Sequence, residues 1–184
     1  DRDTSTNDTC LLLANGMADN PVIKKGTQEY KIFKQALSSV TRDLAMKMAC
    51  DGEGATKLLE VTVKNCDKKE NARELSKSVI TSNLVKTAVY GSDANWGRIL
   101  CALGYAGVSF DPEKVDLFIC VQEESIQIVK DGVATDYSEQ QASKLLSGEK
   151  VTVLCDMHNG EEQATAWGCD LTYDYVKING DYRS

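Results

Sequence analysis

The 184-residue sequence contains little proline or histidine and no long apolar segment. It has two prolines and one histidine, and none of its apolar runs approaches the roughly 20 residues that a helix needs to cross a bilayer. It also lacks a Gly-x-Gly-x-x-Gly fingerprint and a phosphate-binding P-loop, so nothing in it supports a nucleotide site. We therefore expect a soluble protein with no membrane partner.

The sequence also lacks a basic stripe and any Cys-x-x-Cys pair. Its net charge is −7, with acidic and basic residues interspersed, so nucleic acid is not expected as a partner. The odd number of scattered cysteines predicts free, mostly buried thiols in a reducing compartment, rather than disulfides or a zinc site. They are Cys10, Cys50, Cys66, Cys101, Cys120, Cys155 and Cys169.

Hydrophobic periodicity predicts helices and strands that are mixed along the chain. The clearest element is an amphipathic helix over 28–48, for which Thr27 is a suitable N-cap. The pattern lacks regular βαβ repetition, so it predicts a layered α/β (α+β) fold. Further helices are expected at 67–81, 96–105 (opened by Ser92 or Asp93) and 138–146. Strands are expected at 9–14, 58–63, 115–121, 125–130, 150–155 and 163–170, the last two joined by a hairpin turn at Asn159-Gly160.

Three segments carry residues that could form a site. In 51–57, two glycines flank Glu53 and could present its carboxylate to a ligand, although a simple helix stop and turn explains them equally well. Around 86–98, a helix start near Ser92 could bind an anion or simply be capped. The tail 175–184 could bring Asn179 and Ser184 to a site or merely dock on the surface.

Two further polar features, the cluster at 1–9 and the single histidine, are expected to be structural or solvated and not part of a site. The polar cluster at 1–9 suits a turn better than a set of substrate donors. His158, the single histidine, lies in a polar stretch where a solvated loop residue is expected rather than a general base.

Four motifs in order resemble those of one enzyme family. They are Thr4-Ser5-Thr6-Asn7-Asp8-Thr9 leading to Leu11 through Gly16, Glu53-Gly54-Ala55-Thr56-Lys57, Val85 through Arg98, and Asn179 placed five residues before Ser184. Together they resemble the ornithine acetyltransferase family, also called bifunctional glutamate N-acetyltransferase, from the first residues to the last.

The resemblance implies an enzyme of arginine biosynthesis that moves the acetyl group of N-acetylornithine to glutamate by ping-pong chemistry. Acetyl-CoA is a possible further donor substrate, and no cofactor or metal is implied. In the family, a precursor cuts itself before a threonine, which becomes the nucleophile of the β chain. That threonine is expected upstream of Asp1, so this chain would hold no catalytic residue and would be inactive alone. Substrate binding is implied for Glu53, Asn179 and Ser184.

The resemblance also implies an organisation. Residues 1–75 would belong to the catalytic αββα-type domain, and residues 76–184 would form a C-terminal α+β domain whose tail returns to the active site. The expected partners are the α chain and the rest of the β chain, in a heterotetramer of two α and two β chains. The expected location is the cytoplasm, or an organelle in a eukaryote. A related N-terminal-nucleophile amidohydrolase or aminopeptidase is the alternative activity, and a non-catalytic fragment is the third reading.

Overall fold

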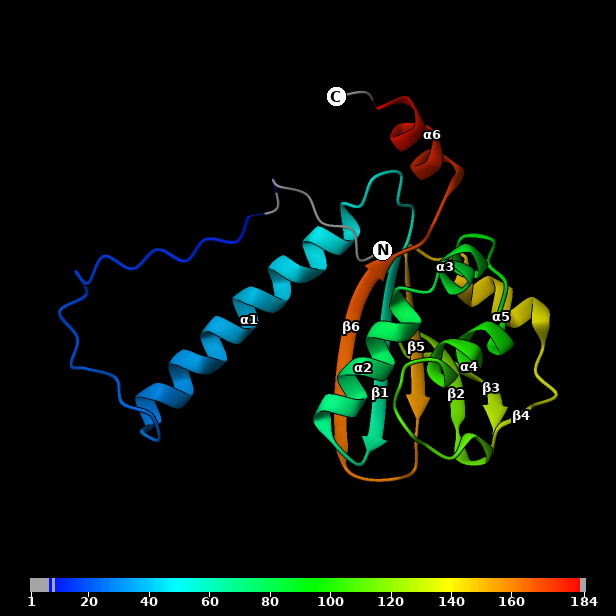
Figure 1. Ribbon diagram of the computed structural model, residues 1–184, viewed down its shortest axis with the longest axis horizontal. Coiled ribbons are helices and arrows are strands. Elements are labelled where there is room, and N and C mark those ends of the chain that lie inside the picture. Colours follow the sequence, from blue (N-terminus) through cyan, green and yellow to red (C-terminus); the bar gives the residue numbers. More distant parts are fainter. Residues whose placement is uncertain (1–6, 8, 183–184) are drawn as a thin grey trace. The chain divides into compact units, whose positions relative to one another are not determined.

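The computed structural model describes residue 7 and residues 9–182, which form two compact units, 1–45 and 46–184 (Figure 1). The polar residues predicted to form a turn at 1–6 and at position 8 lie outside the described residues, as does Ser184. The predicted boundary between residues 75 and 76 falls within the second unit, and the two-domain division stays a prediction.

The first unit contains an irregular segment and most of helix α1 (Gln28–Cys50), which confirms the helix predicted at 28–48. Thr27 begins this helix as predicted, because its hydroxyl accepts a hydrogen bond from the Tyr30 amide at 3.3 Å. The strand predicted at 9–14 is wrong. Leu11, Leu12 and Leu13 are exposed, and none of the described residues pairs with them to satisfy their backbone groups.

The second unit is built on one six-stranded mixed sheet with the order β4-β3-β2-β5-β1-β6 (Figure 1). β1 runs parallel to β5, and the other pairs are antiparallel. The strands are β1 (Leu58–Cys66), β2 (Asp116–Val121), β3 (Glu124–Lys130), β4 (Val133–Ala134), β5 (Lys150–Asp156) and β6 (Glu162–Cys169). The mixed α/β class is therefore confirmed.

Helices pack on the sheet through alternate residues of its strands. α2 (Lys69–Ile80) contacts β1 and β6, α5 (Glu139–Leu146) contacts β2 and β5, and α4 (Trp96–Gly104) packs on α2. On β1, the buried residues Leu59, Val61 and Val63 alternate with the partly exposed Glu60, Thr62 and Lys64. This period of two places the core on one face of the sheet and leaves the other face polar and only partly covered.

The hairpin predicted at Asn159-Gly160 is wrong, because β1 lies between β5 and β6. The connecting loop instead crosses the end of β1, where the Asn159 amide donates to the Asn65 carbonyl at 2.8 Å. A Cβ on Gly160 would overlap the Cys66 carbonyl group. The glycine thus permits a close crossing of two backbones rather than a tight hairpin turn.

Three other expectations need correction. α3 (Asn83–Tyr90) and α6 (Tyr173–Asp181) are helices that the sequence pattern did not predict. α4 is capped by Asn95, which accepts from the Arg98 amide at 3.2 Å, and not by Ser92 or Asp93. The cysteines are not mostly buried: two are buried, two are half-buried and three are exposed.

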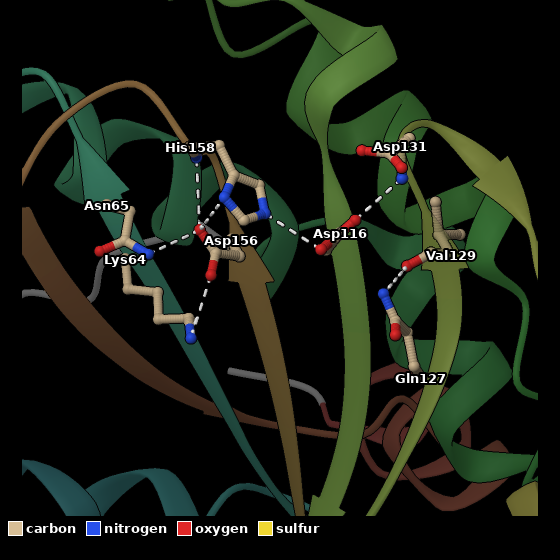
Figure 2. Close-up of polar contacts among 8 residues, drawn as sticks. All are labelled: Lys64, Asn65, Asp116, Gln127, Val129, Asp131, Asp156 and His158. Carbon is tan, nitrogen blue, oxygen red and sulfur yellow. Dashed lines mark hydrogen bonds and ion pairs between the residues drawn. The ribbon is translucent and has the colours of Figure 1, made fainter.

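A polar cluster ties three strands together at the end of β1 and β5 (Figure 2). The Asp156 carboxylate accepts a hydrogen bond from the side-chain amide of Asn65 at 2.8 Å and pairs with the Lys64 ammonium at 3.0 Å. His158 Nε2 lies 3.0 Å from an oxygen of Asp116 on β2. Burial alone would raise the pKa of Asp156, but hydrogen bonds from Asn65 and Lys64 outweigh it and hold the pKa below its ordinary value.

We predict that Asp156→Asn lowers the free energy of unfolding at pH 7 by about 1.5–3 kcal/mol, as expected for buried hydrogen bonds to a charged group. Because the folded-state pKa is lowered, this contribution is fully present above the ordinary value of 3.8 and is lost as the pH falls through the folded value. Urea unfolding at several pH values measures it, with Glu161→Gln in the exposed crossing loop as the control. The prediction would be contradicted if the difference in the free energy of unfolding between the unmodified protein and Asp156→Asn were the same at pH 2 as at pH 7.

Candidate functional site

The segment 51–57 forms a tight loop between α1 and β1. Gly54 has a φ of +65°, and a Cβ there would lie 2.7 Å from the Tyr175 amide nitrogen. The Gly54 position thus meets the first turn of α6, with no room for a side chain. The loop folds this way because only glycine combines this φ with so close an approach at little cost.

Helix α6 begins at the end of β6 and returns to this loop (Figure 1). Thr172, which caps α6, accepts from the Tyr175 amide at 3.2 Å and donates its hydroxyl hydrogen to the Gly54 carbonyl at 2.7 Å. A single buried hydroxyl therefore joins the helix start to the loop.

The loop and the helix bring two of the three predicted site residues together. Asn179 Nδ2 donates to Glu53 Oε2 at 2.8 Å, across 126 residues of sequence, and also to the Tyr175 carbonyl at 2.9 Å. Both side chains are exposed. Their amide and carboxylate form a polar pair that solvent can reach, and the substrate roles of Glu53, Asn179 and Ser184 stay predictions.

The buried carboxylate of Asp170 fixes the other end of the loop. Its Oδ1 accepts from the backbone amides of Thr56 and Lys57 at 2.8 and 3.0 Å, and its Oδ2 accepts from the Thr56 hydroxyl at 2.5 Å. Asp170 is only 3% exposed. A buried carboxylate is stable when hydrogen bonds replace its hydration, and the loop provides them.

The Lys57 ammonium ties the same loop to the ends of two helices. It donates to the carbonyls of Val89 and Leu146 at 2.8 Å each, and to the Ser92 hydroxyl at 2.8 Å. These carbonyls belong to the last turns of α3 and α5, where helix dipoles favour a cation. Burial lowers the pKa of Lys57, and the nearby Asp170 carboxylate opposes this shift.

The structure therefore divides the residues of the motif by role. Thr56 and Lys57 point to structural partners, and Ser92, considered for an anion site, is occupied by Lys57. Glu53 alone presents its carboxylate at the surface. Sequence reasoning missed Asp170 and Thr172, because both lie more than 110 residues from their loop partners and no local pattern marks them.

His158 lies far from this loop. It sits beside the end of β1, whereas the loop precedes the start of β1, and a strand rises about 3.3 Å per residue, which separates the two by roughly 20 Å. Its ring lies between Asp116 and Asp156 (Figure 2). It is an exposed loop residue, as expected, that contacts two carboxylates, and it lies too far away to act as a base for the Glu53 site.

The described part of the chain contains neither a metal-binding cluster nor a membrane-spanning helix. No cluster of three or more histidine, cysteine or acidic side chains there is arranged to hold a metal ion. No helix among those residues has the length and apolar character needed to cross a membrane.

The fold and this loop–helix pair define an α/β protein that presents a carboxylate–amide pair at one end of its sheet. Comparison with known proteins gives its family. The sequence matches the ArgJ family over residues 1–184, and the chain belongs to that family.

Its relatives carry informative names. It is 51% identical over its whole length to "Arginine biosynthesis bifunctional protein ArgJ 1" of Clostridium acetobutylicum, and 52% identical to the ArgJ protein of Symbiobacterium thermophilum. In each case it spans 45% of the relative. The crystal structure of ArgJ from Bacillus halodurans matches with a TM-score of 0.91 and 43% identity, over 99% of this chain and 84% of that one.

We predict that Gly54→Ala separates α6 from the loop. A non-glycine residue in the left-handed region costs about 1–2 kcal/mol before the contact with Tyr175 is counted. The measurement is amide hydrogen exchange of 173–181, which should become faster. Gly180→Ala is the matched control: it lies in the same helix, a Cβ there would meet no atom within 4 Å, and exchange should stay unchanged or become slower. Equal exchange in the two variants would contradict the close approach.

Proposed function

We propose that this chain is the C-terminal part of an acetyltransferase that transfers the acetyl group of N-acetylornithine to glutamate in arginine biosynthesis. The observation that supports it most is the Glu53–Asn179 contact, which joins two residues that the resemblance assigns to substrate binding. Membership of the ArgJ family supports the same activity. Because the chain spans 45% of its relatives, the activity is proposed for the whole enzyme.

The chemistry of the pair favours a cationic group of the substrate. Both Nδ2 hydrogens of Asn179 have acceptors, on Glu53 and Tyr175, and no described residue donates to its Oδ1. The groups left for a ligand are therefore acceptors, the Glu53 carboxylate and the Asn179 carbonyl oxygen. An ammonium of N-acetylornithine or glutamate donates to both, and charge assistance strengthens the bond to Glu53.

In the proposed cycle, the reacting hydroxyl belongs to a threonine in the part of the relatives that this chain does not span. That oxygen attacks the acetyl carbonyl, ornithine leaves as the free amine, and the amine of glutamate then takes the acetyl group from the ester. Acetyl-CoA is a further donor in the bifunctional form. The loop and α6 contribute orientation, which lowers the entropic part of the barrier.

We further propose that the α chain and the rest of the β chain cover apolar surface of this chain, within a heterotetramer. None of the residues of α1 is buried, its apolar residues Ile32, Phe33, Val40 and Met48 are exposed, and Leu11 to Leu13 are exposed as well. Apolar surface of this extent is typical of a surface that another protein segment covers.

We predict that Glu53→Gln in the complete enzyme raises KM or lowers kcat/KM by about tenfold or more, since a hydrogen bond to a charged group contributes roughly 1.5–3 kcal/mol. Steady-state kinetics with N-acetylornithine and glutamate measure the change. Glu161→Gln, which removes an exposed carboxylate away from the site, is the control. Unchanged kinetics in Glu53→Gln would contradict the assignment of Glu53 to substrate binding. Formation of acetate instead of N-acetylglutamate by the unmodified enzyme would reveal a hydrolase.

We predict that removing Arg183 and Ser184 from the complete enzyme lowers kcat/KM by about fivefold or more, because the terminal hydroxyl supplies a hydrogen bond to substrate. Ser184→Thr, which keeps a hydroxyl, should retain most of the activity. Full activity after the deletion would show that the tail only docks.

A further inference from the structure

Helix α6 carries Asn179, and among the described residues no hydrophobic interface fixes it. None of its residues is buried, and Val176 and Ile178 are 65% and 42% exposed. Helices of globular proteins are ordinarily held in place by an apolar face packed on the core. Among the described residues, the contacts at its first turn and the Glu53–Asn179 bond hold α6 in its direction.

The first turn is anchored through the junction between β6 and α6. Thr172 is buried, and its hydroxyl both caps the helix and donates to the Gly54 carbonyl at 2.7 Å. Two residues earlier, Asp170 holds the Thr56 and Lys57 amides of the same loop. The ring of Tyr173 adds an edge-on contact with Tyr90, with centroids 5.9 Å apart.

Small changes at this anchor are amplified at Asn179. The seven steps along the helix from Thr172 to Asn179 span about 10 Å at 1.5 Å per residue. A tilt of about 10° at the first turn would move Asn179 by about 2 Å, which exceeds the tolerance of a hydrogen bond. The bond of 2.8 Å to Glu53 therefore requires that the first turn be fixed.

We propose that Thr172 is a positioning residue for the acetyl-transfer reaction. Its hydroxyl fixes α6 to the Gly54 carbonyl so that Asn179 and Glu53 meet a substrate ammonium together. This role rests on the proposed function for its kinetic consequence, but the helix anchoring that it describes can be measured separately. Thr172 acts only through the geometry of the pair, so binding of the amino-acid substrate should suffer more than the chemical step.

The test compares Thr172→Val, which keeps the shape and removes the hydroxyl, with Thr172→Ser, which keeps the hydroxyl, in the complete enzyme. The Val variant should raise KM about fivefold with kcat within about twofold, the size expected for one lost hydrogen bond. The Ser variant should restore KM. Adding Thr172→Val to Asn179→Ala should raise KM no further, because the two changes disable the same contact. Additive effects, or a loss in kcat alone, would overturn the proposal.

Hydrogen exchange separates this inference from the proposed function. Exchange of the amides of 173–181 should be faster in Thr172→Val than in the unmodified enzyme or in Thr172→Ser. If Glu53→Gln proves kinetically silent while this exchange difference is found, the proposed function fails and the anchoring stands. If exchange is the same in all three proteins, the anchoring is wrong whatever the kinetics of Glu53→Gln.

Discussion

The arrangement of the candidate site depends on the hydrogen bonding of one buried carboxylate. Asp170 accepts two backbone amides and one hydroxyl from Thr56 and Lys57, and so fixes the loop to the end of β6. Without these donors a carboxylate that is almost fully buried would cost several kcal/mol, so the loop conformation and the burial of Asp170 depend on each other. The Lys57 ammonium extends this anchoring to the carboxyl ends of α3 and α5.

This anchoring explains why neighbouring residues of one short motif have different tasks. Gly54 lets the start of α6 approach. Thr56 binds the buried Asp170, and Lys57 binds Ser92. The motif therefore leaves a single charged group, Glu53, facing outward beside Asn179. A carboxylate held on an anchored loop is the kind of preorganised arrangement that binds a charged ligand without a large ordering cost.

Local pattern predicted the elements that bury a periodic face, such as 58–63 and 138–146, and the structure adds that Ser138 caps α5. Local pattern failed where the structure depends on residues that are far apart in the sequence. The Asn159-Gly160 pair has the sequence of a hairpin turn, but β1 inserts between the two strands. The apolar run at 11–13 has the composition of a strand, but nothing in the described residues pairs with it. The Glu53–Asn179 contact spans 126 residues, so local pattern could mark each residue as a candidate but could not show that the two meet.

The central claim is that Glu53 and Asn179 together receive the ammonium of an amino-acid substrate. A crystal structure of the complete enzyme with N-acetylornithine bound tests it most directly. The ammonium of the ligand should lie within about 3 Å of a Glu53 carboxylate oxygen and of Asn179 Oδ1. A ligand bound with its ammonium elsewhere, and with Glu53 still paired only with Asn179, would contradict the claim.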